Sequence, residues 1–139
     1  MKIFFAGAVR GGRANQPHYV YITDTLKQYG TVISGHVADE SISEFGETEL
    51  TKEEIYSREI AALETSDVVV AEVTTPSLGV GYIIGLATSL GKKVVAFYSG
   101  ENTLKLSAMI KGDKDVNVYI YKTPEDVAAV LDSEFKKTE

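Results

Sequence analysis

A run of apolar, mostly β-branched residues, Asp67-Val-Val-Val-Ala-Glu-Val73, constrains the fold of this chain more than any other feature. The run is nearly continuous and does not alternate, which is the pattern of a strand covered on both faces in a parallel sheet. Four other short runs are followed by turn signals, so they also predict strands. They span residues 2–9, 31–37, 93–98 and 117–121.

Helical stretches separate these predicted strands. Pro17 opens one stretch, and the capping pattern Thr51-Lys-Glu-Glu54 opens another. Strand followed by helix, five times over, predicts an α/β domain with a parallel sheet covered on both sides. Right-handed crossovers favour a flavodoxin-like (Rossmann-like) order, 2-1-3-4-5, within one domain over residues 1–139. The expected helices span 17–29, 51–64, 79 or 80 to 91, 104–110 and 123–136.

Composition limits the classes of function. A net charge of -6 argues against a broad basic face for nucleic acid, although two arginines can still create a local anion site. No apolar run approaches the roughly 18 to 20 residues needed to cross a bilayer. The chain has no cysteine and no His/Glu cluster with metal-ligand spacing, so we expect neither metal nor cofactor. A cytoplasmic or nuclear location is expected by default.

The turn after the first predicted strand, Gly7-Ala-Val-Arg-Gly-Gly-Arg13, has the composition of an anion site. Its glycines allow backbone N–H groups to converge on an anion, and its arginines can pair with anion oxygens. In a sheet of this order, ligands bind beyond the carboxyl ends of the first and third strands. The spacing matches neither a Walker loop nor GxGxxG. A flexible connection with solvated arginines is the alternative.

The turn after the third predicted strand, from Thr74 to Tyr82, leads through Ser77 and Gly79 into a helix. A helix N-terminus offers unpaired N–H groups and a positive dipole end to an anion. An ordinary serine N-cap, with glycines that permit close helix–sheet packing, is the alternative. Two such turns at the predicted switch in strand order favour a phosphate-binding site.

Other polar residues are weaker candidates. His36 ends the second predicted strand, where a solvated or backbone-bonded histidine is the alternative. Glu59 lies in a predicted helix, where a solvated carboxylate is the default interpretation. Glu72 lies in a strand that the pattern predicts to be buried, so its carboxylate needs a partner or must be neutral. The acidic, aperiodic segment 38–50 predicts a loop near the mouth of the site.

Three motifs resemble those of the 2'-deoxynucleoside 5'-phosphate N-hydrolases (Rcl proteins) in the nucleoside 2-deoxyribosyltransferase superfamily. The resemblance covers nearly the whole chain in order and spacing. It implies a homodimer that cleaves the N-glycosidic bond of a nucleoside 5'-monophosphate, giving free base and deoxyribose 5-phosphate. The motifs are Arg10-Gly-Gly-Arg13, Asp67–Val73 with Pro76-Ser-Leu-Gly-Val-Gly-Tyr82, and Leu106-Ser-Ala-Met-Ile110.

The resemblance carries the ligand-binding positions over residue by residue. His36 and Met109 match residues beside the base, and Ala8 stands where the family has an additional phosphate-binding serine. The resemblance implies that Ser107 and Met109 reach the site of the other subunit. The matched phosphate-binding positions are Arg10, Gly11, Gly12, Ser77, Gly79 and Ser107.

The catalytic positions depart from the family. Ile83 takes the place of its glutamate, Phe4 that of its tyrosine and Glu59 that of its aspartate. Isoleucine can neither attack a sugar nor stabilise its developing positive charge, so we expect a loss of orders of magnitude in rate. Three interpretations stay open: a hydrolase that uses another carboxylate, with Glu59 best placed; a silent nucleotide-binding module; or a chain whose pocket was emptied by engineering.

Overall fold

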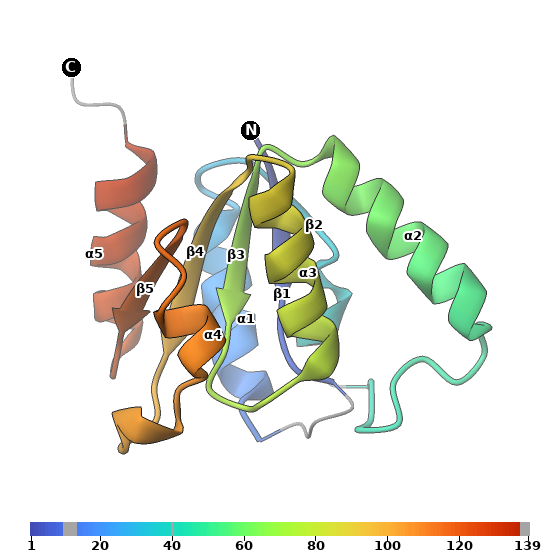
Figure 1. Cartoon of the computed structure of the whole chain (residues 1–139), viewed down its shortest axis with the longest axis horizontal. Helices are drawn as coiled ribbons and strands as arrows, with labels where there is room; N and C mark the ends of the chain where they lie inside the picture. Colours follow the sequence, from blue (N-terminus) through green and yellow to red (C-terminus); the bar gives the residue numbers. More distant parts are fainter. Residues whose placement is uncertain (10–13, 40, 137–139) are drawn as a thin grey trace.

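The computed structural model describes residues 1–9, 14–39 and 41–136. In this part of the chain one sheet holds five parallel strands in the order β2-β1-β3-β4-β5 (Figure 1). The predicted α/β class and flavodoxin-like order are therefore confirmed. The strands are β1 (Lys2–Ala6), β2 (Thr31–Ile33), β3 (Val68–Glu72), β4 (Lys93–Tyr98) and β5 (Val116–Ile120).

Helices cover both faces of the sheet. One face packs against α1 and α5, and the opposite face packs against α2 and α3. Two short 3-10 helices, η1 (Gly35–Ala38) and η2 (Thr103–Lys105), lie in the connections. The described helices include none that is long and apolar enough to cross a membrane. The α-helices are α1 (Gln16–Leu26), α2 (Lys52–Thr65), α3 (Leu78–Ser89), α4 (Ala108–Lys111) and α5 (Pro124–Phe135).

The continuous apolar run of β3 follows from its central position. Val68 and Val70 face α1 and α5, whereas Val69 and Ala71 face α2 and α3, and all four are buried. A fully buried valine contributes about 1.5–3 kcal/mol, so both faces of the strand help to hold the layers together.

The second predicted strand is shorter than expected. It ends at Ile33 because Ser34 adopts a left-handed backbone conformation, with φ of 59°. The chain then turns into η1, and His36 lies in this turn and not at a strand end. A non-glycine residue in this region costs about 1–3 kcal/mol and needs support from its surroundings.

The predicted helix over 104–110 divides into η2 and α4. The Asn102 side chain accepts a hydrogen bond from the Leu104 N–H at 2.9 Å, which starts η2. The Ser107 hydroxyl accepts one from the Ile110 N–H at 3.4 Å, which starts α4. Two side-chain caps, five residues apart in the sequence, therefore interrupt what the sequence pattern predicted as one helix. The first predicted strand also ends earlier, at Ala6.

Candidate nucleotide-binding site

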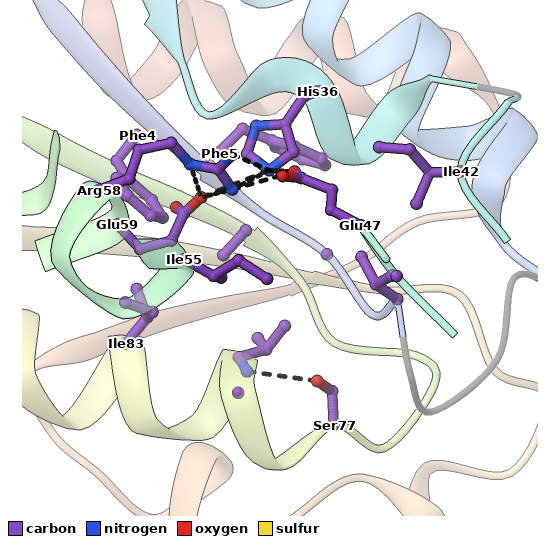
Figure 2. A pocket seen from close by; sticks show the side chains of 16 residues that line it. Phe4, Phe5, His36, Ile42, Glu47, Ile55, Arg58, Glu59, Ser77 and Ile83 are labelled. Carbon is purple, nitrogen blue, oxygen red and sulfur yellow. Dashed lines mark hydrogen bonds and ion pairs between the residues drawn. The ribbon is translucent and has the colours of Figure 1, made fainter. Parts of the chain in front are cut away.

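A cavity of about 230 Å³ lies at the carboxyl end of β1, between the sheet, α2 and α3 (Figure 2). Its walls come from four parts of the chain that are distant in sequence. They are the end of β1 and its turn (Phe4, Phe5, Ala6, Gly7, Val9), the segment after β2 (His36, Ile42, Gly46, Glu47), α2 (Ile55, Arg58, Glu59) and the start of α3 (Ser77, Gly79, Val80, Ile83).

The turns that follow β1 and β3 meet at this cavity. Gly7 and Val9 line it from the first turn, and Ser77 and Gly79 line it from the second. Tyr19 of α1 fixes the first turn, because its hydroxyl accepts a hydrogen bond from the Ala8 N–H at 2.9 Å. A side chain at position 7 would meet the Tyr19 ring at 2.9 Å, so glycine is required there.

The arginine and the paired glycines predicted to bind phosphate, Arg10, Gly11 and Gly12, lie outside the described residues. Their role stays a prediction. The nearest described residues are Val9 before this segment and Ala14 after it, and Val9 lines the cavity. The chain therefore enters this segment at the cavity wall.

The N-terminus of α3 has the features of an anion site as well as an ordinary cap. The Ser77 hydroxyl accepts a hydrogen bond from the Val80 N–H at 3.2 Å, and the first intrahelical bond runs from the Gly81 N–H to the Ser77 carbonyl. The N–H groups of Leu78 and Gly79 precede that bond. The first turn of α3 carries no acidic residue, unlike those of α2 and α5.

Close packing does not explain Gly79 and Gly81. A Cβ added at Gly79 would meet only the Ser77 hydroxyl, at 4.0 Å, and one added at Gly81 would meet nothing within 4 Å. The absence of a side chain at Gly79 instead leaves the helix end open to the cavity.

Arg58 lies at the centre of a charged cluster at the opposite end of the cavity from Ser77 (Figure 2). Its guanidinium forms two hydrogen bonds to the carboxylate of Glu47, at 2.6 and 3.0 Å. Two more go to a single oxygen of Glu59, at 2.7 and 3.1 Å. His36 Nε2 lies 3.0 Å from Glu47 and 3.3 Å from Glu59, so it donates to them when it carries a proton.

Both oxygens of Glu59 are occupied. Arg58 binds Oε1, and the Ser34 hydroxyl donates to Oε2 at 2.8 Å. Ser34 is the residue with the left-handed backbone, so the strained turn after β2 supplies this hydrogen bond. The hydrogen bonds from Arg58 also hold the pKa of Glu47 below its ordinary value.

The predictions from sequence did not include Arg58, and included Glu47 only as part of the acidic segment 38–50. One signal for Arg58 was present. Ile55, Arg58 and Glu59 have the spacing i, i+3, i+4, which places them on one face of a helix. Glu47 depends on the path of an irregular loop, for which the sequence gives no periodicity.

Another part of the cavity wall is apolar. Phe4 is 2% exposed, and Ile83 is half-buried on the cavity side of α3. Ile55 adds to the same apolar surface from α2. Among the described residues, this part of the wall carries no carboxylate. The two carboxylates that line the cavity, Glu47 and Glu59, both bind Arg58.

Ser107 and Met109 line a neighbouring groove and not the cavity itself. This groove, of about 770 Å³, shares Ser77, Gly79 and Val80 with the cavity. Met109 is 83% exposed. Within one chain, Ser107 and Met109 line this groove together with the start of α3. Their contribution to the site of a second subunit stays a prediction. The described residues contain no group of His, Asp and Glu arranged for a metal ion.

Comparison with known sequences decides the family. A sequence model of the family described as nucleoside 2-deoxyribosyltransferase matches residues 3–128. This chain belongs to the nucleoside 2-deoxyribosyltransferase family. The resemblance expected from its motifs is therefore confirmed, and the match includes the cavity walls from β1, α2 and α3.

Within this family, several relatives carry the names of nucleotide N-hydrolases. The 5-hydroxymethyl-dUMP N-hydrolase of Mus musculus is 44% identical over 81% of this chain and 66% of its own length. That of Esox lucius is 38% identical over 98% of this chain and 97% of its own. A putative 2'-deoxynucleoside 5'-phosphate N-hydrolase 1 of Nematostella vectensis is 43% identical, with coverage of 94% and 90%.

A solved structure shares the fold of this family member. The Clostridium botulinum CMP N-glycosidase BcmB superposes with a TM-score of 0.66 at 17% sequence identity, covering 96% of this chain and 99% of that one. At this identity the likeness concerns the fold alone.

Proposed function

We propose that this protein binds a nucleoside 5'-monophosphate in the cavity and has lost most of the N-glycosidase activity for which its relatives are named. The observation that carries the proposal is the state of the cavity's carboxylates. Glu47 and Glu59 are both bound to Arg58, and Ile83 stands where the resemblance places the family's glutamate.

The phosphate would bind where the two turns meet. Ser77 and Gly79 at the start of α3 line this end of the cavity, and Arg10 follows directly from the cavity-lining Val9. Helix dipole, N–H groups and a guanidinium together favour a dianionic group. The overall charge of -6 then leaves a local positive site in an acidic protein.

The sugar would lie against the apolar wall of Phe4, Ile55 and Ile83. Cleavage of the N-glycosidic bond develops positive charge on the sugar, and an anionic group at the right place is needed to stabilise it. Isoleucine and phenylalanine supply none. The absence of polar groups on this wall suits a less polar or larger base.

A hydrolase that uses Glu59 is the second candidate. Glu59 lines the cavity, and it occupies the position of the family's aspartate in the resemblance. For this activity it would have to exchange its contacts with Arg58 and Ser34 for a contact with the sugar. Glu59→Gln separates the two candidates: it abolishes release of free base if Glu59 is the catalytic group, and changes no measurable turnover if the site is silent.

Binding calorimetry tests the phosphate site. A 2'-deoxynucleoside 5'-monophosphate should bind more tightly than the corresponding nucleoside, because only the former reaches the two turns. Arg10→Ala should weaken the monophosphate about 10- to 100-fold, as expected for a charge-assisted hydrogen bond, and leave the nucleoside unchanged. Lys27→Ala, on the exposed end of α1, serves as the matched control. Equal weakening of both ligands by Arg10→Ala would contradict the proposal.

We also propose that the protein forms a homodimer through the groove beside α3. Leu78 is 97% exposed and Met109 is 83% exposed, and both line this groove. A contiguous exposed apolar surface of this kind is typical of an interface. A second copy would cover it and bring Ser107 toward the neighbouring cavity.

Sedimentation equilibrium tests the dimer. The protein should sediment as a dimer, and Leu78→Asp should convert it to a monomer. Ile120→Asp, which changes a 49% exposed residue at the β5 edge, should leave the dimer intact. A monomeric wild-type protein would refute the interface.

A further inference from the structure

A second polar cluster lies at the carboxyl ends of β3, β4 and β5, on the face of the sheet opposite the cavity. Its centre is Glu72, the last residue of β3, which is fully buried. The Glu72 carboxylate accepts a hydrogen bond from the Thr74 N–H at 2.5 Å through one oxygen. Its other oxygen accepts one from the Tyr121 hydroxyl at 3.0 Å.

These contacts belong to a closed ring of hydrogen bonds. The Tyr121 hydroxyl lies 2.8 Å from Nδ1 of His18 in α1, and that nitrogen lies 3.5 Å from the Ser99 hydroxyl. Ser99 donates its backbone N–H to the Thr74 hydroxyl at 2.8 Å. The Thr74 N–H, which donates to Glu72, closes the ring. The ring therefore links the ends of three strands to α1.

Glu72 has no ion-pair partner in the part of the chain that the structure describes. Burial raises its pKa above the ordinary value, since removal from water disfavours the charged form. A buried carboxylate without a cation destabilises a protein, and an apolar side chain of similar size would avoid that cost. The side chain therefore serves something other than packing.

The ring fixes the beginning of the turn that lines the cavity. The Val73 N–H donates to the Phe97 carbonyl at 2.8 Å, Glu72 and Ser99 hold Thr74, and the Asn15 side chain donates to the Thr75 hydroxyl at 2.9 Å. Hydrogen bonds thus fix three consecutive residues, Val73 to Thr75, just before Ser77. Loss of the Glu72 carboxylate would leave the Thr74 N–H without its acceptor.

We propose that Glu72 is a positioning residue for the phosphate: through Thr74 it sets the orientation of the turn that carries Ser77 and Gly79 at the cavity. This inference rests on the proposed nucleotide-binding function. Glu72 does not line the cavity, so it acts only through the backbone.

Glutamine should replace Glu72 without loss. Its side-chain oxygen can accept from the Thr74 N–H, and its NH₂ group can donate to the Tyr121 oxygen. Tyr121 then donates to Nδ1 of His18 in the tautomer that carries its proton on Nε2, so every hydrogen bond of the ring is kept. Leucine has a similar volume and keeps none of them, and Tyr121→Phe breaks the ring one step away.

Binding calorimetry with a 2'-deoxynucleoside 5'-monophosphate and with the corresponding nucleoside tests this role. Glu72→Leu should weaken the monophosphate by about tenfold or more, the factor for one lost hydrogen bond, and leave the nucleoside affinity unchanged. Glu72→Gln should bind both ligands as the wild type does. Tyr121→Phe should weaken the monophosphate by a smaller factor. A purely structural role would lower both affinities together, and that result would overturn the inference.

Thr74→Val covers the case in which Glu72→Leu does not fold. It removes the hydroxyl that accepts from Ser99 and keeps the side-chain volume, so it should lower the monophosphate affinity alone. An unchanged ratio of the two affinities in Thr74→Val and Tyr121→Phe would overturn the inference while leaving the proposed function intact. A wild-type protein that binds the two ligands equally would overturn both.

Discussion

Arg58 determines what the two carboxylates of the cavity can do. It forms a two-point contact with Glu47 and also binds one oxygen of Glu59, so neither acid faces the cavity without a cation. A carboxylate held in this way is a weaker nucleophile than an unpaired one, because its charge is already shared with a donor. Arg58 therefore weakens both carboxylates of the cavity as catalytic groups.

Arg58→Gln should raise the pKa of Glu47. In the wild type the hydrogen bonds from Arg58 keep this pKa below the ordinary value of 4.5, and desolvation opposes them. Carboxyl carbon shifts measured by NMR against pH should show the Glu47 midpoint below 4.5 in the wild type and higher in the variant. A midpoint that does not move would show that Arg58 and Glu47 are not paired in solution.

Ile83→Glu should restore release of free base from a nucleoside 5'-monophosphate. A carboxylate on the apolar wall would face the sugar and stabilise its developing charge, which we expect to raise the rate about 100-fold. Chromatography of the released base measures this rate.

Ile83→Gln has nearly the same size as Ile83→Glu and no charge, so it should show no gain. If Ile83→Glu is equally inactive, Ile83 is not the decisive loss, and the Phe4 position must be restored as well.

At the scale of elements, the start of α1 holds both turns that form the predicted phosphate site. Tyr19 bonds to Ala8 in the first turn, and Asn15 bonds to Thr75 in the second. His18 reaches the second turn through Tyr121 and Glu72. Because one helix contacts both turns, their separation is set by rigid structure and not by the turns themselves.

The N-caps of α3 and α5 offer a matched pair for a test. Ser77 and Thr123 each accept a backbone hydrogen bond three residues on. Ser77→Ala and Thr123→Ala should each lower the free energy of unfolding by about 1 kcal/mol. Only Ser77→Ala should weaken binding of the monophosphate, because Thr123 lies away from the cavity. Calorimetry of binding and denaturant unfolding of both variants give the two readouts, and equal binding losses would contradict a ligand role for Ser77.

At the scale of the whole molecule, Glu72 should give the stability a pH dependence. Burial raises its folded-state pKa, so the folded protein retains a proton at pH values above 4.5 where the unfolded chain has lost it. Unfolding free energy should therefore fall as the pH rises through this window. Glu72→Gln removes the effect and should be more stable than the wild type at about pH 8.

Denaturant unfolding at about pH 5 and about pH 8 measures this difference. Glu101→Gln, at an exposed glutamate, is the matched control and should leave the pH dependence unchanged. A Glu72→Gln variant whose stability follows that of the wild type at both pH values would contradict the burial of a charge at this position.

The sheet order and the meeting of the two turns were predictable because both follow from local patterns. The apolar run of β3 reports burial on both faces, and parallel strands place their carboxyl ends at one edge. The charged cluster was not predictable in the same way. Glu47 reaches Arg58 only through the path of an irregular loop, and the ring around Glu72 joins residues from β3, β5 and α1 that no sequence spacing connects.

The most direct measurement is a crystal structure of the protein with a 2'-deoxynucleoside 5'-monophosphate. We expect the phosphate to lie between the Gly7–Val9 turn and the N–H groups of Leu78 and Gly79. We also expect Ile83 and Phe4, and no carboxylate, to stand within about 3 to 3.5 Å of the anomeric carbon. A phosphate bound away from the start of α3, or Glu59 released from Arg58 and in contact with that carbon, would contradict these expectations.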